Sequence, residues 1–286
     1  MVLRGLIVAL AIAASASAAS AQIVVENAGT VSPETPVLRT RFETARWDDG
    51  TDVRLTESYF WAPRPLLDFG LSVPLVRREL DPSGGSDAEY GGIGDISFRV
   101  KNVFHQSDGV MRSTRFAALA GVELPTGSWH EEEGGVDVPR DLQIGTGTFG
   151  FYGGPLLTHI ADRHRFAGEV IGQVHTERDD FQPGASLRLG GSYWYRISPA
   201  IVEVAGERTE LRGVVELTHV YFADGRVDGD RVGDGGTETT LWLGVQVYPS
   251  ASVLLEAAVQ VPLHETTRDF RGDRGVGGLL TLKILF

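Results

Sequence analysis

The chain has 286 residues, 42% of them apolar, with 36 glycines and no cysteine. Its formal net charge of −12 argues against a nucleic-acid partner, because binding to a phosphate backbone needs a basic surface. The lack of cysteine excludes disulfide frameworks, cysteine zinc sites and thiol nucleophiles. Glycine at about 13%, against a usual ~7%, favours an all-β chain.

The first residues have the composition of a secretory signal peptide. Arg4 supplies a positive charge, residues 6–13 form an apolar run, and residues 19–21 fit the small-x-small cleavage pattern. The apolar run is far shorter than the ~20 residues that a membrane-spanning helix needs. We therefore expect residues 1–21 to be removed, so that the mature chain starts at Gln22.

Apolar residues recur at every second position through most of the mature chain. Leu67, Phe69 and Leu71 alternate with Asp68 and Gly70, for example. Successive side chains of a strand point to opposite faces, so such segments have one apolar and one polar face. We expect no helices and twelve strands, near residues 35–47, 52–61, 66–78, 92–104, 112–124, 142–158, 165–175, 186–196, 200–221, 238–248, 251–263 and 276–286.

The separators between these strands alternate between short and long. This pattern is typical of an up-and-down barrel with short turns on one rim and long loops on the other. Only the turn at 48–50 is short where a long loop is due, and segment 200–221 is too long for one spanning strand of ~9–11 residues. That segment either projects beyond the membrane or contains an extra hairpin. We expect the short turns and both termini in the periplasm and the long loops outside, at 79–91, 125–141, 176–185, 222–237 and 264–275.

The direction in which the apolar strand faces point distinguishes two all-β architectures. A soluble sandwich or lipocalin-like barrel turns its apolar face inward, whereas an outer-membrane barrel turns it toward lipid. The signal peptide, the strand lengths and the chain end favour the membrane barrel. The alternating residues at that end resemble the signal that the barrel assembly machinery reads, and they are Leu280, Leu282, Ile284 and Phe286.

The expected protein is therefore an all-β, antiparallel up-and-down barrel of about twelve strands in the outer membrane of a Gram-negative bacterium. Its expected segments are the signal peptide 1–21, a periplasmic segment 22–34 and the barrel 35–286. Outer-membrane lipid, lipopolysaccharide and the assembly machinery are its expected partners.

Three short motifs resemble one family. They are GGIGDI at 91–96, LPTGS at 124–128 and LEAAVQVP at 255–262. The chain resembles, over about residues 30–286, the family of proteins assigned to the meta-pathway of phenol degradation. This resemblance implies an outer-membrane barrel of the transporter kind, with aromatic compounds as the solutes. The segment near 207–222 is longer than the resemblance leads us to expect.

No motif of catalysis or metal binding emerges. An EF-hand loop starting at Asp228 fails, because Val232 and Thr239 occupy ligand positions. The seven histidines form no HExxH motif, and His219 has no Gly-x-Ser-x-Gly partner for a lipid hydrolase. We expect no metal, no cofactor and no enzyme activity.

The polar strand faces carry the functional information. If the apolar faces meet lipid, the lumen is lined by charged and amide side chains of both signs. The expected lining residues are Arg39, Arg41, Glu43, Asp68, Asp95, Arg99, Lys101, Arg115, Glu123, Glu169, Gln173, Arg188, Arg196, Glu203, Glu256, Gln260 and Lys283. Such charges either pair with each other and fill the barrel, or border a narrow passage. Glu57 is a misfit, because it falls on the lipid face of its strand.

The sequence thus favours a passive channel or uptake protein for small solutes, with aromatic or hydrophobic solutes suggested by the resemblance. A structural or envelope-interaction barrel that does not conduct is the first alternative. An outer-membrane enzyme that modifies lipid is the second.

Overall fold

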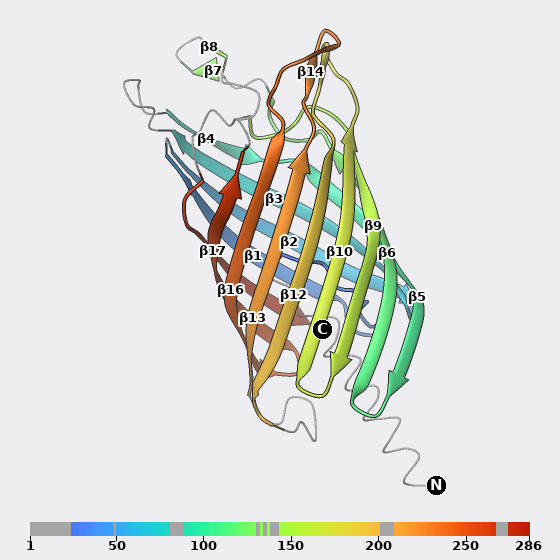
Figure 1. The fold of residues 1–286 in the computed structure, drawn as a ribbon. Coiled ribbons are helices and arrows are strands. Elements are labelled where there is room, and N and C mark those ends of the chain that lie inside the picture. Colours follow the sequence, from blue (N-terminus) through green and yellow to red (C-terminus); the bar gives the residue numbers. More distant parts are fainter. Residues whose placement is uncertain are drawn as a thin grey trace.

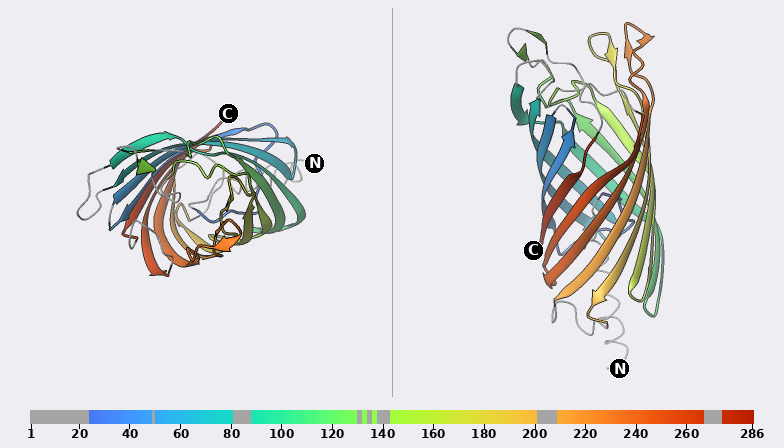
Figure 2. Two further views of the ribbon diagram at one scale, coloured as in Figure 1. Left: turned by 90° about the horizontal axis from the view of Figure 1, so that it is seen from above. Right: turned by 60° about the vertical axis from the view of Figure 1, so that its left-hand side comes forward.

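The computed structural model describes residues 24–48, 50–80, 88–129, 132–133, 136–137, 143–200, 209–266 and 274–286. Its strands are tilted and pair in antiparallel fashion around a closed ring (Figures 1 and 2). The ring strands are β1 (Val37–Trp47), β2 (Gly50–Arg64), β3 (Leu67–Leu80), β4 (Ala88–Ile93), β5 (Ile96–Gly109), β6 (Arg112–Leu124), β9 (Gly150–Ala161), β10 (His164–His175), β12 (Ser186–Ser198), β13 (Glu210–Phe222), β16 (Gly236–Ser250), β17 (Val253–Glu265) and β18 (Gly277–Leu285).

The ring closes because β1 pairs with both β2 and β18, the last strand of the chain. Strands β4 and β5 both pair with β3, and only Gly94 and Asp95 separate them, so they act as one interrupted strand. The thirteen strands of the sheet therefore occupy twelve positions. The expected all-β, twelve-stranded antiparallel barrel is confirmed. Five two-residue strands lie in the connections: β7 (Glu132–Glu133), β8 (Val136–Asp137), β11 (Phe181–Gln182), β14 (Arg226–Val227) and β15 (Asp230–Arg231).

Two strands begin well after the residue at which they are expected. The strand expected over 142–158 begins only at Gly150, and residues 143–149 form no strand. The strand expected over 200–221 begins at Glu210, while 201–208 lies outside the described residues. Over residues 143–149 the chain leaves the sheet for contacts that a local pattern does not report.

Tight turns join most strands at one rim of the barrel. Leu66, Met111 and Asp162 take positive φ values of 67°, 57° and 55° in three of these turns. The turn between β1 and β2 is also short, as expected, although it lies at the rim of the long connections. Within the described residues, no helix is long and apolar enough to cross a membrane.

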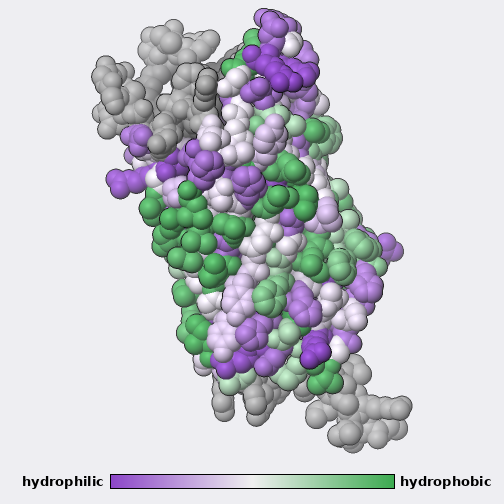
Figure 3. All heavy atoms as spheres, viewed as in Figure 1, coloured by the Kyte–Doolittle hydropathy of each residue, from purple (hydrophilic) through white to green (hydrophobic). Residues whose placement is uncertain are grey.

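The outer surface of the barrel is apolar. Leu75, Leu217, Leu243 and Leu255 are each 46–47% exposed, although each lies within a paired strand. Apolar residues gather over the middle of the face in Figure 3, and hydrophilic residues concentrate toward its two ends. An apolar band between polar rims is the surface that a bilayer requires of a barrel.

The interior of the barrel is polar. Asp68, Lys101, Glu216, Gln246 and Gln260 are at most 2% exposed. A soluble sandwich would place apolar side chains at such positions. The polar interior and the apolar exterior together exclude the soluble architecture.

Candidate functional site

The chain before the first strand lies inside the barrel. Val25, Asn27 and Ala28 have no exposed surface, and the trace passes through the ring seen from above (Figure 2). We call residues 24–36 the plug segment. From the sequence we expected residues 22–34 to form a periplasmic segment, whereas the described part from Val24 onward enters the lumen. The reason for the difference is that lumen side chains accept hydrogen bonds from the backbone N–H groups of this segment, and a local pattern cannot reveal such contacts.

Two carboxylates hold the N-terminal end of the plug segment. Glu216 Oε2 accepts hydrogen bonds from the backbone N of Val24 at 2.6 Å and of Val25 at 2.9 Å. Glu169 Oε2 accepts one from the backbone N of Glu26 at 2.8 Å. The other oxygen of Glu169 pairs with Nε of Arg188 at 2.8 Å. Hydrogen bonds to ionised acceptors are roughly twice as strong as neutral ones.

Cationic side chains hold the plug segment from another part of the wall. Nη1 of Arg99 lies 2.6 Å from Oε2 of Glu26. Nζ of Lys101 donates to the carbonyl of Asn27 at 3.3 Å and lies 3.6 Å from Oδ2 of Asp68. The guanidinium of Arg99 also lies over the ring of Phe60, 4.5 Å from its centroid. The plug segment therefore joins acidic residues of β10 and β13 to basic residues of β5.

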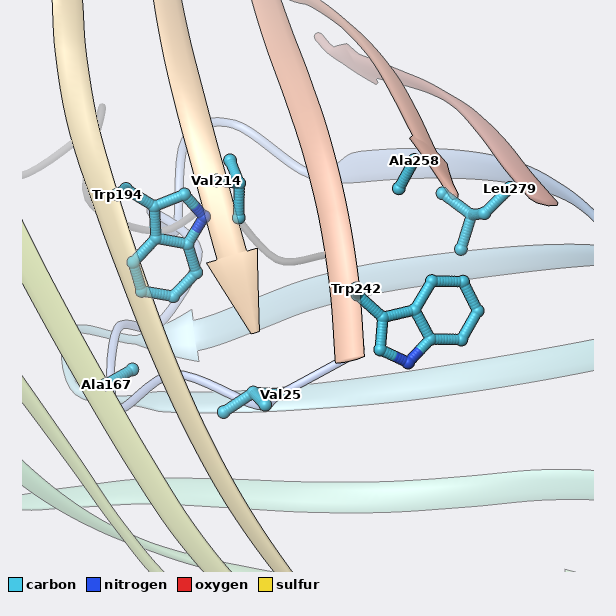
Figure 4. Packing of buried hydrophobic residues seen from close by; sticks show 7 residues of the cluster. All are labelled: Val25, Ala167, Trp194, Val214, Trp242, Ala258 and Leu279. Atoms are coloured by element: carbon cyan, nitrogen blue, oxygen red, sulfur yellow. The ribbon is translucent and has the colours of Figure 1, made fainter. Parts of the chain in front are cut away.

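Apolar contacts also hold the plug segment in the lumen. Val25 belongs to a buried cluster with Trp194 and Trp242, and Figure 4 shows Val25 between the two indole rings. Trp194 is 1% exposed and Trp242 is 6% exposed. The other members of this cluster are Ala167, Val214, Ala258 and Leu279.

Several further expected lining residues lie on the inner face of β1, β17 and β18. Arg39 donates to Ser58 Oγ at 3.4 Å, and Arg41 lies 3.8 Å from Glu43. Glu256 accepts a hydrogen bond from Gln246. Lys283 is 4% exposed. Arg115 on β6 is also buried, at 5%.

A connection folds into the mouth of the barrel at the rim of the long loops. Asp95 accepts hydrogen bonds from the backbone N of Gly127 at 2.9 Å and from the backbone N of Thr146 at 2.7 Å. Arg78 Nη1 donates to the carbonyl of Gln143 at 2.6 Å. Asp95 was expected to line an open lumen, but it holds residues 143–149 in place through the hydrogen bond to Thr146.

Glu123 lies close to this connection. It accepts a hydrogen bond from Gln173 at 2.7 Å. His175 lies two residues after Gln173 on β10, and its Nδ1 is 3.4 Å from Thr148 Oγ1. The expected residues Glu123 and Gln173 are thus brought together beside the inward-folded residues.

A cavity of about 260 Å³ lies beside this mouth. Arg274 borders it, and its guanidinium lies 5.2 Å from the centroid of the Trp47 ring and 3.2 Å from Glu238 Oε2. With its amide oxygen turned toward Arg274, Gln260 accepts from Nη2 and Nε of that residue, both at 2.9 Å. The remaining lining residues are Glu43, Thr44, Ala45, Asp52, Arg54 and Trp242. Trp242 therefore takes part in both the cavity and the cluster around the plug segment.

One expected lining residue lies at a rim of the barrel. Arg196 sits near the rim of the tight turns, where its backbone N donates to the carbonyl of Arg163 at 2.9 Å. Glu203 lies outside the described residues. The residues that sequence reasoning missed include Glu26, Arg78, Glu216 and Arg274. Of these, Glu216 alternates with Val215 and Leu217, so the pattern that found its neighbours could have found it.

Three further described histidines contact hydroxyl groups of threonine or tyrosine. His159 contacts Thr114 at 2.8 Å, His164 contacts Tyr193 at 2.9 Å, and His219 contacts Thr239 at 2.9 Å. In the part of the chain that the structure describes, no three histidine or acidic side chains are grouped so that they could hold a metal ion.

No family model matches this chain, and no curated protein matches it in sequence. Among solved structures it is similar to an outer membrane channel from Pseudomonas putida F1, with a TM-score of 0.74 and 11% identity over 93% of this chain and 100% of that chain. It is also similar to the beta domain of the Bordetella autotransporter BrkA, with a TM-score of 0.52 and 12% identity over 88% of this chain and 99% of that chain. These likenesses show the fold, which is that of outer-membrane β-barrel proteins.

Proposed function

We propose that this protein is an outer-membrane channel for small solutes whose lumen the plug segment closes. The observation that carries the proposal is that residues 24–31 occupy the lumen through contacts with separate strands of the wall. Their partners include Glu216 on β13, Glu169 on β10 and Arg99 on β5. A segment held in this way blocks the passage of solutes.

The plug segment belongs to no ring strand, which supports a closure that can be released. It precedes β1, so it can leave the lumen without breaking a hydrogen bond between ring strands. Its removal would expose charged side chains from all sides of the lumen. Twelve strands enclose an interior wider than that of a barrel with eight strands, which side chains alone can fill.

The solute class proposed from the family resemblance is aromatic. Trp47 and Trp242 border the 260 Å³ cavity and offer aromatic faces to such a solute. Membership of the phenol-degradation family itself is a proposal that rests on the sequence motifs. We also propose that the charged residues expected from the sequence line the lumen once the plug segment has left it.

A structural barrel that never conducts is the second candidate. The buried ion pairs Arg99–Glu26, Lys101–Asp68 and Arg188–Glu169 favour it, because interlocked charges can fill a lumen permanently. We propose no enzyme activity, since the histidine rings described above contact threonine and tyrosine rather than serine.

We also propose a route by which the protein reaches its membrane. Residues 1–21 would be cleaved during export, and the barrel assembly machinery would read the chain end at Phe286. Lipid would contact the apolar belt, and lipopolysaccharide the outer rim. The two termini of the mature chain would be periplasmic.

Conductance of a variant that lacks residues 24–34 tests the channel. In planar bilayers we expect this variant to conduct steadily, while the full chain conducts weakly or in brief openings. The matched control is Glu34→Gln, because Glu34 is exposed and lies near the C-terminal end of the plug segment. Equal, negligible conductance of a folded deletion variant and of the full chain would favour the structural barrel.

A further inference from the structure

One residue of the plug segment spans the acidic and the basic parts of the lumen wall. The backbone N of Glu26 donates to Glu169 at 2.8 Å, and the carboxylate of the same residue lies 2.6 Å from Arg99. In glutamate, three carbon atoms separate this nitrogen from the carboxylate carbon. The two wall residues belong to β10 and β5, which do not pair with each other. Glu26 is thus held at both ends of its skeleton.

From this geometry, and resting on the proposed channel function, we propose that the open lumen binds, besides the aromatic solutes considered above, solutes that carry a carboxylate three carbons away from an N–H donor. Free glutamate and γ-amino acids belong to this class. The plug segment then acts as an internal mimic of the solute, and solute and plug segment compete for the same wall residues.

The wall left behind by the plug segment supports this choice. The side chain of Arg99 is 12% exposed while the plug segment is in place, and release of that segment removes its closest carboxylate. The carboxylate of a solute would restore this charge-assisted pair. Lys101 is already engaged by Asp68, which leaves Arg99 as the main anchor for that carboxylate.

The acidic part of the wall would hold the other end of the solute. Oε1 of Glu169 is paired with Arg188, while Oε2 accepts the N–H of Glu26. Glu216 accepts two more backbone N–H groups close by. An ammonium group supplies several N–H donors, so it can replace these amides at either carboxylate.

This arrangement predicts discrimination between close analogues. L-Glutamine has the skeleton of L-glutamate but a neutral amide in place of the side-chain carboxylate, so its side chain cannot form the ion pair with Arg99. A site built for a charged group rejects an analogue that lacks it, because its own charge stays unpaired. We expect L-glutamate to bind at least tenfold more tightly than L-glutamine.

The first experiment measures binding of labelled L-glutamate to the detergent-solubilised barrel that lacks residues 24–34, with L-glutamine as competitor. The preference for glutamate should disappear in Arg99→Gln and persist in Arg112→Gln, a control with the same loss of charge at an exposed position at the start of β6. Equal binding of the two solutes would overturn the inference. This readout does not need conduction, so a deletion variant that binds glutamate but fails to conduct would count against the channel and not against the site.

A second experiment uses the full chain and covers the case in which the deletion variant does not fold. The chain has no cysteine, so Val25→Cys introduces a single thiol at a position with no exposed surface. Its labelling by a water-soluble maleimide reports release of the plug segment. L-Glutamate should raise the labelling rate several-fold and L-glutamine should not. The same rate with both solutes would contradict competition between solute and plug segment.

Discussion

Glu26 and Arg99 form an ion pair with 2.6 Å between Oε2 and Nη1, in which both side chains are largely buried. The pair joins a segment outside the sheet to the barrel wall. Removing one partner of such a pair leaves the other charge without compensation in the interior. The state of this pair should therefore control whether the plug segment stays in the lumen.

Glu26→Gln should loosen the plug segment. A hydrogen bond to a charged group contributes about 1.5–3 kcal/mol, which corresponds to tenfold or more in the population of the released state. We expect maleimide labelling of Val25→Cys to be about tenfold faster in the Glu26→Gln background. Glu34→Gln, at an exposed position, is the control, and equal labelling rates in both backgrounds would contradict the role of the pair.

Asp95→Asn should release the connection that folds into the mouth. Asp95 accepts hydrogen bonds from the backbone N of Gly127 and of Thr146, and an amide side chain is a weaker acceptor without charge. We expect hydrogen exchange of residues 143–149 to become about tenfold faster. Asp108→Asn, in a hairpin at the other rim, should leave that exchange unchanged, and protection retained in Asp95→Asn would show that other contacts hold the connection.

Trp194→Ala should destabilise the barrel and the plug segment together. Trp194 is 1% exposed and shares its cluster with Val25, so truncation should cost about 3–5 kcal/mol of the free energy of unfolding. Urea unfolding in lipid vesicles measures this loss. The loss should be smaller in the variant without residues 24–34, because part of the packing is already gone. A loss of the same size in both backgrounds would mean that Val25 contributes nothing.

Phe286→Asp should impair membrane assembly far more than Thr281→Ser. Phe286 is 59% exposed at the end of the chain, whereas Thr281 faces the interior and is 4% exposed. A charge on the lipid face opposes insertion, and it removes the aromatic end that we expect the assembly machinery to read. The yield of heat-modifiable barrel in membranes measures assembly. A normal yield of Phe286→Asp would refute this expectation.

Protease treatment of intact cells should cut the long connections and spare the tight turns. Arg226 and Arg231 are exposed in the connection between β13 and β16, and we expect trypsin to cleave there. Arg112, exposed at the opposite rim, should be cleaved only after the outer membrane is permeabilised. Cleavage at Arg112 in intact cells would reverse the orientation.

The sequence by itself determined the strands and the polarity of their faces. Side chains of a strand alternate between the two faces, so residues such as Leu217 and Leu255 report their environment through their immediate neighbours. Glu57 was recognised as a polar residue on the outer face by the same rule. The structure adds that Thr40 on the neighbouring strand donates a hydrogen bond to it at 3.0 Å.

Only the tertiary structure decided what fills the lumen. The plug segment is held through backbone N–H groups, which every residue except proline carries, so no side-chain pattern announces that Val24 and Val25 bind Glu216. The partners of Arg99 and Asp95 also depend on how the closed ring brings distant strands and connections together. Alternation tells which way a side chain points, whereas closure of the barrel decides what it meets there.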